Sequence, residues 1–487
     1  MTLVSSLGDI AVAVLLGGPV LTALLVMALP GHGVAAALNT LSSFLSFLAA
    51  VVLLEQRPEP SLFIQVDDLN VALIALTTFI AFTSSLFSAG YIAHERRTGR
   101  LTRRTSRLYH AMYQSLMFAM NLALLANNIG LMWVAIELAT LTAVLMVGLY
   151  RTPAALEAAW KYFILGSVGV ALALFGTILV YFAASGSVGD GLDAMAWTVL
   201  VARADGFEPT LLNIAFIFLL LGYGTKMGLV PMHAWLPDAH AEGPTPITAV
   251  LSGLLINVSL YVVLRFKMVV TANPHTLPPG PLMAGLGLFT VVFATLMLYQ
   301  RGDIKRLFAY SSIEHMGLAA FAFGMGGPLA NFAGLLHMVM HSLTKSAIFF
   351  AVGHIVQVKG TQRISGIRGL GDSHPLLGWG LALGVLAIAG LPPFGVFLSE
   401  FMLISATFQR APLLTLTLIA GLLIALGALL LRLNDLVLGP AESQGPDQPR
   451  EGTVLPLVLH LLLVLIAGLW LPPPLVAWFQ HVAAMLG

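Results

Sequence analysis

Three ionisable residues lie inside long apolar stretches of this sequence, where a charge is costly to bury. Glu137 stands in LMWVAIELATLTAV, Lys226 in LLLGYGTKMGLVPMHAWLP, and Glu400 in AIAGLPPFGVFLSEFMLI. A charged side chain at the depth of a bilayer core costs at least about 2.5–3.5 kcal/mol, so it normally faces a partner or water. Acids and bases at such positions predict that protons pass between buried side chains.

A further group of titratable residues has helical spacing. His337, His341 and Lys345 follow one another at i, i+4 and i+8, which places them on one helix face, and Glu314 and His315 stand in AYSSIEHMGLAAF. A histidine pair beside a lysine can accept and release protons near neutral pH. The simpler alternative is that the histidines stay neutral and hydrogen-bond neighbouring helices. A metal site is a third reading, although no glutamate follows the first histidine as in H-E-x-x-H.

Prolines stand close to two of the buried charges. Pro231 follows Lys226 by five residues and clashes with the carbonyl of Met227, so the helix should break just beyond the lysine. A second group precedes Glu400 by five to eight residues and consists of Pro392, Pro393 and Gly395. Two interrupted spans with a charge beside each break are typical of an inverted-repeat transporter. Chance is the alternative, since Pro and Gly are common in membrane helices.

The composition predicts an all-α, multi-pass membrane protein. Apolar residues make up 58% of the chain and charged residues only 9%, with a mean hydropathy of +0.92. Soluble domains carry about 25% charged residues. The stretches have the length of membrane-crossing helices and no period-2 alternation of a barrel. The first 29 residues contain no Lys or Arg, so we expect a retained first span and no cleaved signal peptide.

The absence of cysteine limits the chemistry of the chain. With no Cys, iron–sulfur clusters and disulfides are excluded, and we expect no cofactor in this chain. Any redox chemistry would then belong to a partner. The net charge of +1 offers no argument for nucleic acid as a partner.

Pro, Gly and charged residues divide the apolar stretches and predict about fourteen transmembrane helices, of which the seventh and twelfth are discontinuous. A short apolar piece, 474–486, is expected to be interfacial or an extension of the last span. The predicted units are an N-terminal three-helix segment (1–108), a first five-helix repeat (109–268), an inverted second repeat (281–432), and a cytoplasmic loop with the C-terminal span (433–487). The spans are 10–29, 34–54, 68–92, 109–126, 129–149, 157–184, 210–237, 246–268, 281–299, 304–324, 329–357, 376–408, 412–432 and 454–471.

The distribution of positive charge predicts the orientation. The loop 94–108 reads HERRTGRLTRRTSRL, and with every second loop after it holds 16 of the 23 Lys and Arg residues, Lys305 among them. Five fall on the other side and two inside spans. Positive charge marks the cytoplasmic side. We therefore expect a cytoplasmic (inner) membrane protein of a prokaryote with both termini outside.

Long motifs resemble a known family. MGLVPMHAWLPDAHAEGPTPITAVLSG, DIKRLFAYSSIEHMG and HMVMHSLTKSAIFF resemble the antiporter-like subunits of respiratory complex I, Mrp-type cation antiporters and group 4 membrane-bound hydrogenases, over roughly residues 121–402. Within this family, WVAIELATL and EAAWKYFILGSVGVALALFGTILVY look most like component F of the hydrogenase-4 and formate hydrogenlyase type.

The resemblance implies roles for the matching residues. Glu137 would pair with Lys226, His341 and Lys345 would form a connecting polar axis, and Glu400 would be its terminal site. The eighth span usually offers a lysine or histidine, whereas this sequence has Asn257 in LLINVSLYVVLRF. Asparagine does not titrate, so the relay would use water, use His315 or His337, or be weakened. The long lateral helix of one complex I subunit is not expected here.

The sequence is compatible with three functions. The first is a proton-translocating subunit of a redox-driven complex, without a redox centre of its own, whose partners are other membrane subunits and a peripheral [NiFe] hydrogenase or quinone-reductase-like module. The second is a Na⁺/H⁺ antiporter subunit of an Mrp-type complex. The third is an inert membrane anchor, which would have no need for the buried charges.

Overall fold

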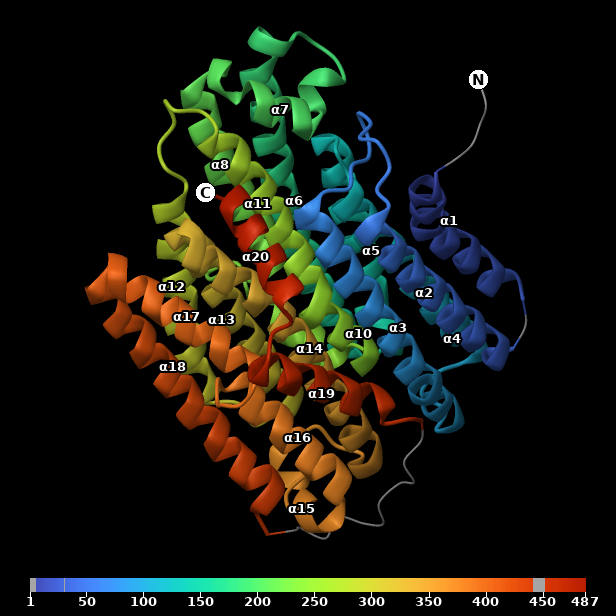
Figure 1. The fold of residues 1–487 in the computed structure, drawn as a ribbon. Coiled ribbons are helices and arrows are strands. Elements are labelled where there is room, and N and C mark those ends of the chain that lie inside the picture. The colour runs from blue at the N-terminus through green and yellow to red at the C-terminus, as the bar shows by residue number, and fades with distance from the viewer. Residues whose placement is uncertain (1–5, 30, 441–451) are drawn as a thin grey trace.

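The computed structural model describes residues 6–29, 31–440 and 452–487 (Figure 1). Residues 1–5 of the predicted first segment and 441–451 of the predicted cytoplasmic loop lie outside this description. Helices make up the fold, and the described residues contain no β-strand beyond isolated bridges such as Ile64–Ala126. The predicted all-α fold class is confirmed.

The helices follow one another through short connections. The first half contains α1 (Leu7–Ala28), α2 (His32–Glu55), α3 (Asp68–Arg97), α4 (Arg103–Leu125), α5 (Ile129–Val147), α6 (Pro153–Val188), α7 (Trp197–Arg203), α8 (Pro209–Met227), α9 (Trp235–Glu242), α10 (Thr245–Val250) and, after a π-helical turn at Leu251–Leu255, α11 (Ile256–Thr271). The second half contains α12 (Gly280–Leu298), α13 (Ile304–Met325), α14 (Gly327–Lys359), α15 (Leu370–Ser373), α16 (Pro375–Ile388), α17 (Gly395–Arg410), α18 (Pro412–Leu433), α19 (Leu455–Leu469) and α20 (Pro473–Met485).

Fewer helices than predicted meet a strict length-and-hydropathy test for crossing a bilayer. Ten helices within the described ranges meet it, or eleven if α19 and α20 form one bent span. The remaining predicted spans correspond to α4 and α13, which carry buried polar side chains, and to α16 and α17, which are separated by a break. The number fourteen therefore stays a prediction.

The apolar piece 474–486 forms α20, which packs one face against the rest of the protein and leaves most of its residues half-buried or exposed. α20 bends by 81° from α19 and runs along α14 (Figure 1). Asn331 on α14 donates to the carbonyl of Ala483, and Lys267 on α11 donates to that of Leu486. Phe479 and Val482 are buried in the same contact. Because α19 and α20 together have the length and hydropathy of one bent span, the choice between an interfacial piece and an extension of the last span stays a prediction.

The centre of the molecule consists of α11 and α14, which are almost entirely buried. Around them, α6 packs closely on α8 because glycines remove side chains from the contact. A Cβ on Gly222 would meet the backbone of α6, and one on Gly169 would meet Thr225 at 2.6 Å. Small residues at helix contacts allow this approach in membranes. Thr225 and Lys226 of α8 therefore lie directly against the glycines of α6.

A buried ion pair fastens α3 to α11. Arg265 is fully buried and donates to both carboxylate oxygens of Asp67, at 2.6 and 2.8 Å. Its Nε donates to the hydroxyl of Tyr261, and its guanidinium lies over the ring of Trp197. Burial alone would favour neutral Asp67, but the Arg265 guanidinium outweighs it and lowers the pKa of this carboxyl.

Asp67→Asn should destabilise the fold by about 3 kcal/mol, the lower end for a broken buried pair, because Asp67 is 23% exposed. Asn still caps α3, so the change isolates the charge. Since the folded-state pKa of Asp67 is lowered, its contribution is complete above the ordinary value of about 4 and is lost as the pH falls further. The measurement is the Tm in detergent, compared with wild type from pH 7 to pH 3.

Asp68→Asn is the matched control for this experiment. Asp68 pairs with Arg57 at 2.6 Å, but both side chains are about one-third exposed. Such pairs contribute about 0–1 kcal/mol. Equal losses of Tm in the two variants, or a loss in Asp67→Asn that does not depend on pH, would contradict the role of the buried pair.

Candidate functional site

The first helix break comes directly after Lys226. α8 ends at Met227, Gly228 adopts a left-handed conformation (φ 78°), the Val230–Pro231 peptide bond is cis, and α9 starts at Trp235. The break lies where Pro231 predicts it. Lys226 occupies the last turn of α8, where the carbonyl ends of the helix favour a cation.

A glycine makes the room for the Lys226 ammonium. A Cβ on Gly166 of α6 would lie 2.6 Å from Lys226 Nζ and 3.3 Å from the Thr140 methyl group, so the lysine fills the space of a missing side chain. On another side, Nζ lies 5.3 Å from the centre of the Tyr162 ring. That ring stacks on Trp235 at 4.1 Å, which ties the lysine site to the start of α9.

Glu137 on α5 interacts electrostatically with Lys226. The described residues provide no hydrogen-bond partner for Glu137 Oε2 or Lys226 Nζ and no ion pair between the two within 4.0 Å. The pair therefore acts through space and does not form a closed salt bridge. A link through one water stays a prediction.

The second break has the same elements as the first. α16 ends at Ile388, Gly390 has a positive φ of 66°, the Pro392–Pro393 bond is cis, and α17 starts at Gly395. Glu400 lies one turn into α17, and its Oε2 occupies the space that a Cβ of Gly390 would need. Lys226 and Glu400 thus both rest against a glycine.

Three helices contribute to a cluster of histidines and Glu400. His315 Nδ1 on α13 lies 3.1 Å from His337 Nε2 on α14, and 4.0 Å from Glu400 Oε1 on α17. The other ring nitrogen of His337 lies 3.0 Å from Ser399 Oγ. The His341 ring is 5.5 Å from that of His315, and within the described chain neither of its nitrogens has a hydrogen-bond partner. The structure therefore unites the predicted residues of α14 with His315 and Glu400.

The same cluster has the composition of a metal site. Donor atoms of His315, His337 and Glu400 all lie within 4.8 Å of one another, and histidine with carboxylate is a common ligand set. The predicted i, i+4 pair of His337 and His341 is not this set. In the structure, the facing nitrogens of His315 and His337 share a hydrogen bond, which is the geometry of a proton relay.

Lys345 connects the histidine cluster to the hydroxyl groups of Ser312 and Ser252. Its Nζ donates to the carbonyl of Phe308, which also accepts a hydrogen bond from Ser312. Ser312 in turn shares a 2.6 Å hydrogen bond with Ser252. Glu314 interacts electrostatically with both Lys345 and Glu400. Polar groups thus continue from α14 to the π-helical turn that precedes α11.

Asn257 ties α11 to α14. Its amide donates to Ser342 Oγ at 2.6 Å and to the Met338 carbonyl at 3.0 Å. Its Oδ1 is buried and lacks a partner among the described residues. Ser259, by contrast, donates to a carbonyl of its own helix. Asn257 therefore stands beside the His341 face but cannot carry a proton by titration.

Sequence reasoning placed Lys305 in a loop, and the structure buries it. Its Nζ donates to the carbonyls of Ala241 and Gly243, at 2.9 and 2.6 Å. It lines a polar cavity of about 290 Å³ together with Glu242 and two tyrosines, Tyr91 and Tyr150. The missed signal is the spacing i, i+7, i+10 of Lys305, Ser312 and His315, which puts all three on one face of α13.

Further residues outside the predicted set stand close to this route. His240 on α9 is fully buried, and neither of its ring nitrogens has a hydrogen-bond partner among the described residues. It interacts electrostatically with both Lys305 and Lys345. The motif around it was recognised from the sequence, but nothing in the residue order indicated that it interacts with these two lysines.

Comparisons with known proteins agree in sequence and in structure. A family model described as "NADH:quinone oxidoreductase/Mrp antiporter, TM" matches residues 126–426. The hydrogenase-4 component F homolog of Methylacidiphilum infernorum (isolate V4) is 59% identical over 468 residues, which are 96% of this chain and 98% of the relative.

Two solved structures share the fold. A chain of the membrane-bound sulfane sulfur reductase, an archaeal respiratory membrane complex, has a TM-score of 0.85 at 23% identity and covers 98% of this chain and 97% of its own. A chain of the Mrp complex from Dietzia sp. DQ12-45-1b has a TM-score of 0.81 at 17% identity, with coverages of 98% and 97%. These relatives are subunits of multi-subunit membrane complexes.

Gly166→Ala should displace Lys226 without weakening α6, since alanine in a helix interior is about 1 kcal/mol better than glycine. We expect proton translocation to fall at least about tenfold, because small displacements of a reacting group have effects of that size. The measurement is dye-reported acidification of vesicles that contain the assembled complex. Gly186→Ala is the matched control, because a Cβ there meets nothing within 4 Å. Unchanged translocation in Gly166→Ala would show that the Lys226 position is not critical.

Proposed function

Because the chain belongs to the NADH:quinone oxidoreductase/Mrp antiporter family and is an antiporter-like membrane subunit, we propose that it moves protons along its buried Glu/Lys/His axis. The driving force would be a redox reaction in a partner module. The chain is a multi-pass integral membrane protein. We also propose that it lies in the cytoplasmic membrane of a prokaryote, with both termini outside.

One observation carries the proposal: ionisable groups line the interior and are left without full sets of partners. Lys226, Lys345, His315 and His341 are at most 1% exposed. Lys226 Nζ and both nitrogens of His341 have no hydrogen-bond partner among the described residues. Retaining such groups is costly in a membrane and has no benefit for a mere anchor. A path for protons accounts for them.

The geometry supports a route through the second half of the chain. The polar cavity at Lys305 and Glu242 opens towards the arginine-rich end of the molecule and would admit protons. From there, His240 and Lys345 lead to His341, and the hydrogen-bonded pair His315–His337 leads to Glu400. The break at Gly390 would connect Glu400 to the opposite end.

Lys226 and Glu137 would couple this route to the partner. A charge change in a neighbouring subunit would alter the distance between them, and separation removes the carboxylate that favours the protonated lysine. A proton would then leave Lys226 towards Lys345. We propose that the partners are other membrane subunits and a peripheral [NiFe] hydrogenase or quinone-reductase-like module, and that this chain carries no cofactor.

A second candidate function is Na⁺/H⁺ exchange in an Mrp-type complex, since the description of the matching family model includes Mrp antiporters. The two candidates differ in their need for sodium. Co-purification with a [NiFe] subunit together with translocation in sodium-free buffer supports the first. Flux that requires a sodium gradient, without an electron donor, supports the second.

Glu400→Gln tests the proposed function directly. The variant keeps the shape of the side chain but cannot bind and release a proton, so electron-donor-driven acidification of vesicles should be lost while the complex still assembles. Assembly is checked by gel filtration of the detergent-solubilised complex. Glu157→Gln, an exposed carboxylate paired with Lys161, is the control. Normal pumping by Glu400→Gln would remove this residue from the route.

Asn257→Leu tests the link between the two halves. The sequence predicts ordered water between Lys226 and the His341 face, held by Asn257, Ser252 or Ser259, because buried polar groups normally recruit water. Since the Ser259 hydroxyl already donates to the carbonyl of Leu255, we expect Asn257 and Ser252 to hold it. Leucine keeps the volume and removes the polar atoms, so proton flux should fall severalfold. Ser259→Ala is the control, since the Ser259 hydroxyl donates to the carbonyl of Leu255 one turn earlier. A dry gap in a high-resolution map together with unchanged flux in Asn257→Leu would overturn the link.

A further inference from the structure

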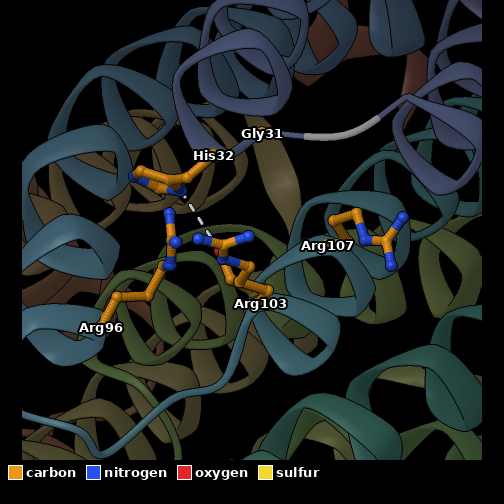
Figure 2. A pocket seen from close by; sticks show the side chains of 6 residues that line it. Gly31, His32, Arg96, Arg103 and Arg107 are labelled. Atoms are coloured by element: carbon orange, nitrogen blue, oxygen red, sulfur yellow. Dashed lines mark hydrogen bonds between the residues drawn. The ribbon is translucent and has the colours of Figure 1, made fainter.

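A basic pocket lies at the arginine-rich end of the molecule, and none of its lining residues belongs to the proposed proton route. It is formed by the start of α2, the end of α3 and the start of α4, and its volume is about 500 Å³. Figure 2 shows the guanidinium groups of Arg96 and Arg103 beside each other below His32, with Arg107 further along. Like charges at such close quarters favour an anion between them.

The described chain supplies no anion to this pocket. Arg96, Arg103 and Arg107 form no ion pair within 4.0 Å among the described residues, whereas nearby Arg100 pairs with Glu95 at 3.6 Å. The start of α2 also has no side-chain cap, so its N–H groups add to the positive potential. A phosphate group matches both features, because arginine forks and helix N-termini bind it.

An apolar groove continues from the pocket along α2 and α3. It shares His32 with the pocket, has a volume of about 710 Å³, and reaches Phe44 and Phe82. From His32 to Phe44 the helix rises about 18 Å, which is close to one leaflet of a hydrocarbon core about 30 Å thick. Leu41, in the wall of the groove, is 53% exposed. The groove therefore faces the lipid and has the length of an acyl chain.

We infer that this site binds an anionic phospholipid, with its phosphate between Arg96 and Arg103 and an acyl chain in the groove from His32 to Phe44. A free phosphate would fill the basic pocket but would leave the groove without an occupant. An acidic segment of a partner subunit would satisfy the arginines, yet a groove one leaflet long and open to the membrane fits a hydrocarbon chain. The site is independent of the proton route.

The test uses the detergent-purified complex, stripped of lipid, and phosphatidylglycerol as the probe. Phosphatidylglycerol should raise the Tm, while inorganic phosphate at the same concentration should not. In Arg96→Gln/Arg103→Gln the apparent affinity for phosphatidylglycerol should fall at least about tenfold, because each charge-assisted hydrogen bond contributes enough for such a change. Arg104→Gln, an exposed arginine of α4 that does not line the pocket, should behave as wild type.

A second variant fills the groove and leaves the arginines in place. Ala37→Trp should weaken binding of phosphatidylglycerol, whereas Val34→Trp, on α2 but outside the groove, should not. An equal effect of inorganic phosphate, with Ala37→Trp unchanged, would overturn the proposal in favour of a free anion. Loss of a partner subunit from Arg96→Gln/Arg103→Gln, without any lipid effect, would overturn it in favour of a protein contact. A Tm that responds to none of these probes would also overturn it.

Discussion

The organisation of this protein follows from the cost of placing a charge where water cannot reach it. A buried ionisable group needs a space of its own size and an oriented polar neighbour. Here the space comes from glycine: Lys226 rests over Gly166, and the Glu400 carboxylate rests over Gly390. The polar neighbours are the carbonyl end of α8 at Lys226 and the hydrogen-bonded imidazole rings of His315 and His337 near Glu400. The broken helices are therefore part of the solvation of the charges.

The sequence allowed the fold class, the two breaks and the family to be predicted. Apolar stretches about 20 residues long have only one stable backbone form in a membrane, and Pro231 and Pro393 mark where it stops. The resemblance to the antiporter-like subunits is confirmed by the family match and by the relative with 59% identity. The number of spans is harder to predict, because the buried polar faces of α4 and α13 reduce the very signal that reveals a span.

The sequence predicted several residues of the buried cluster as candidates, but it did not predict Lys305, His240 or the contacts between helices. His337, His341 and Lys345 were grouped because a helix has a fixed period. That His315 faces His337, and that Lys305 is buried beneath the loop around Gly243, depends on how α13 packs against other helices. No local pattern records such packing. Their place in the proton route stays a prediction, as does the division into two inverted repeats.

Because α14 is unbroken, the distances between its polar residues are fixed, whereas their distances to residues of other helices can change. His337, His341 and Lys345 ride on a single 33-residue helix, so a tilt of that helix moves them together, and their mutual spacing stays nearly constant. Their hydrogen bonds described above are to other helices: His337 bonds to His315 and Ser399, and Lys345 bonds to the carbonyl of Phe308. Hydrogen bonds weaken steeply with small displacements, so a slight shift of α13 or α17 is sufficient to break one of these bonds. On the proposed proton route, α14 would therefore act as a rigid element, and only its contacts with α13 and α17 would form or break.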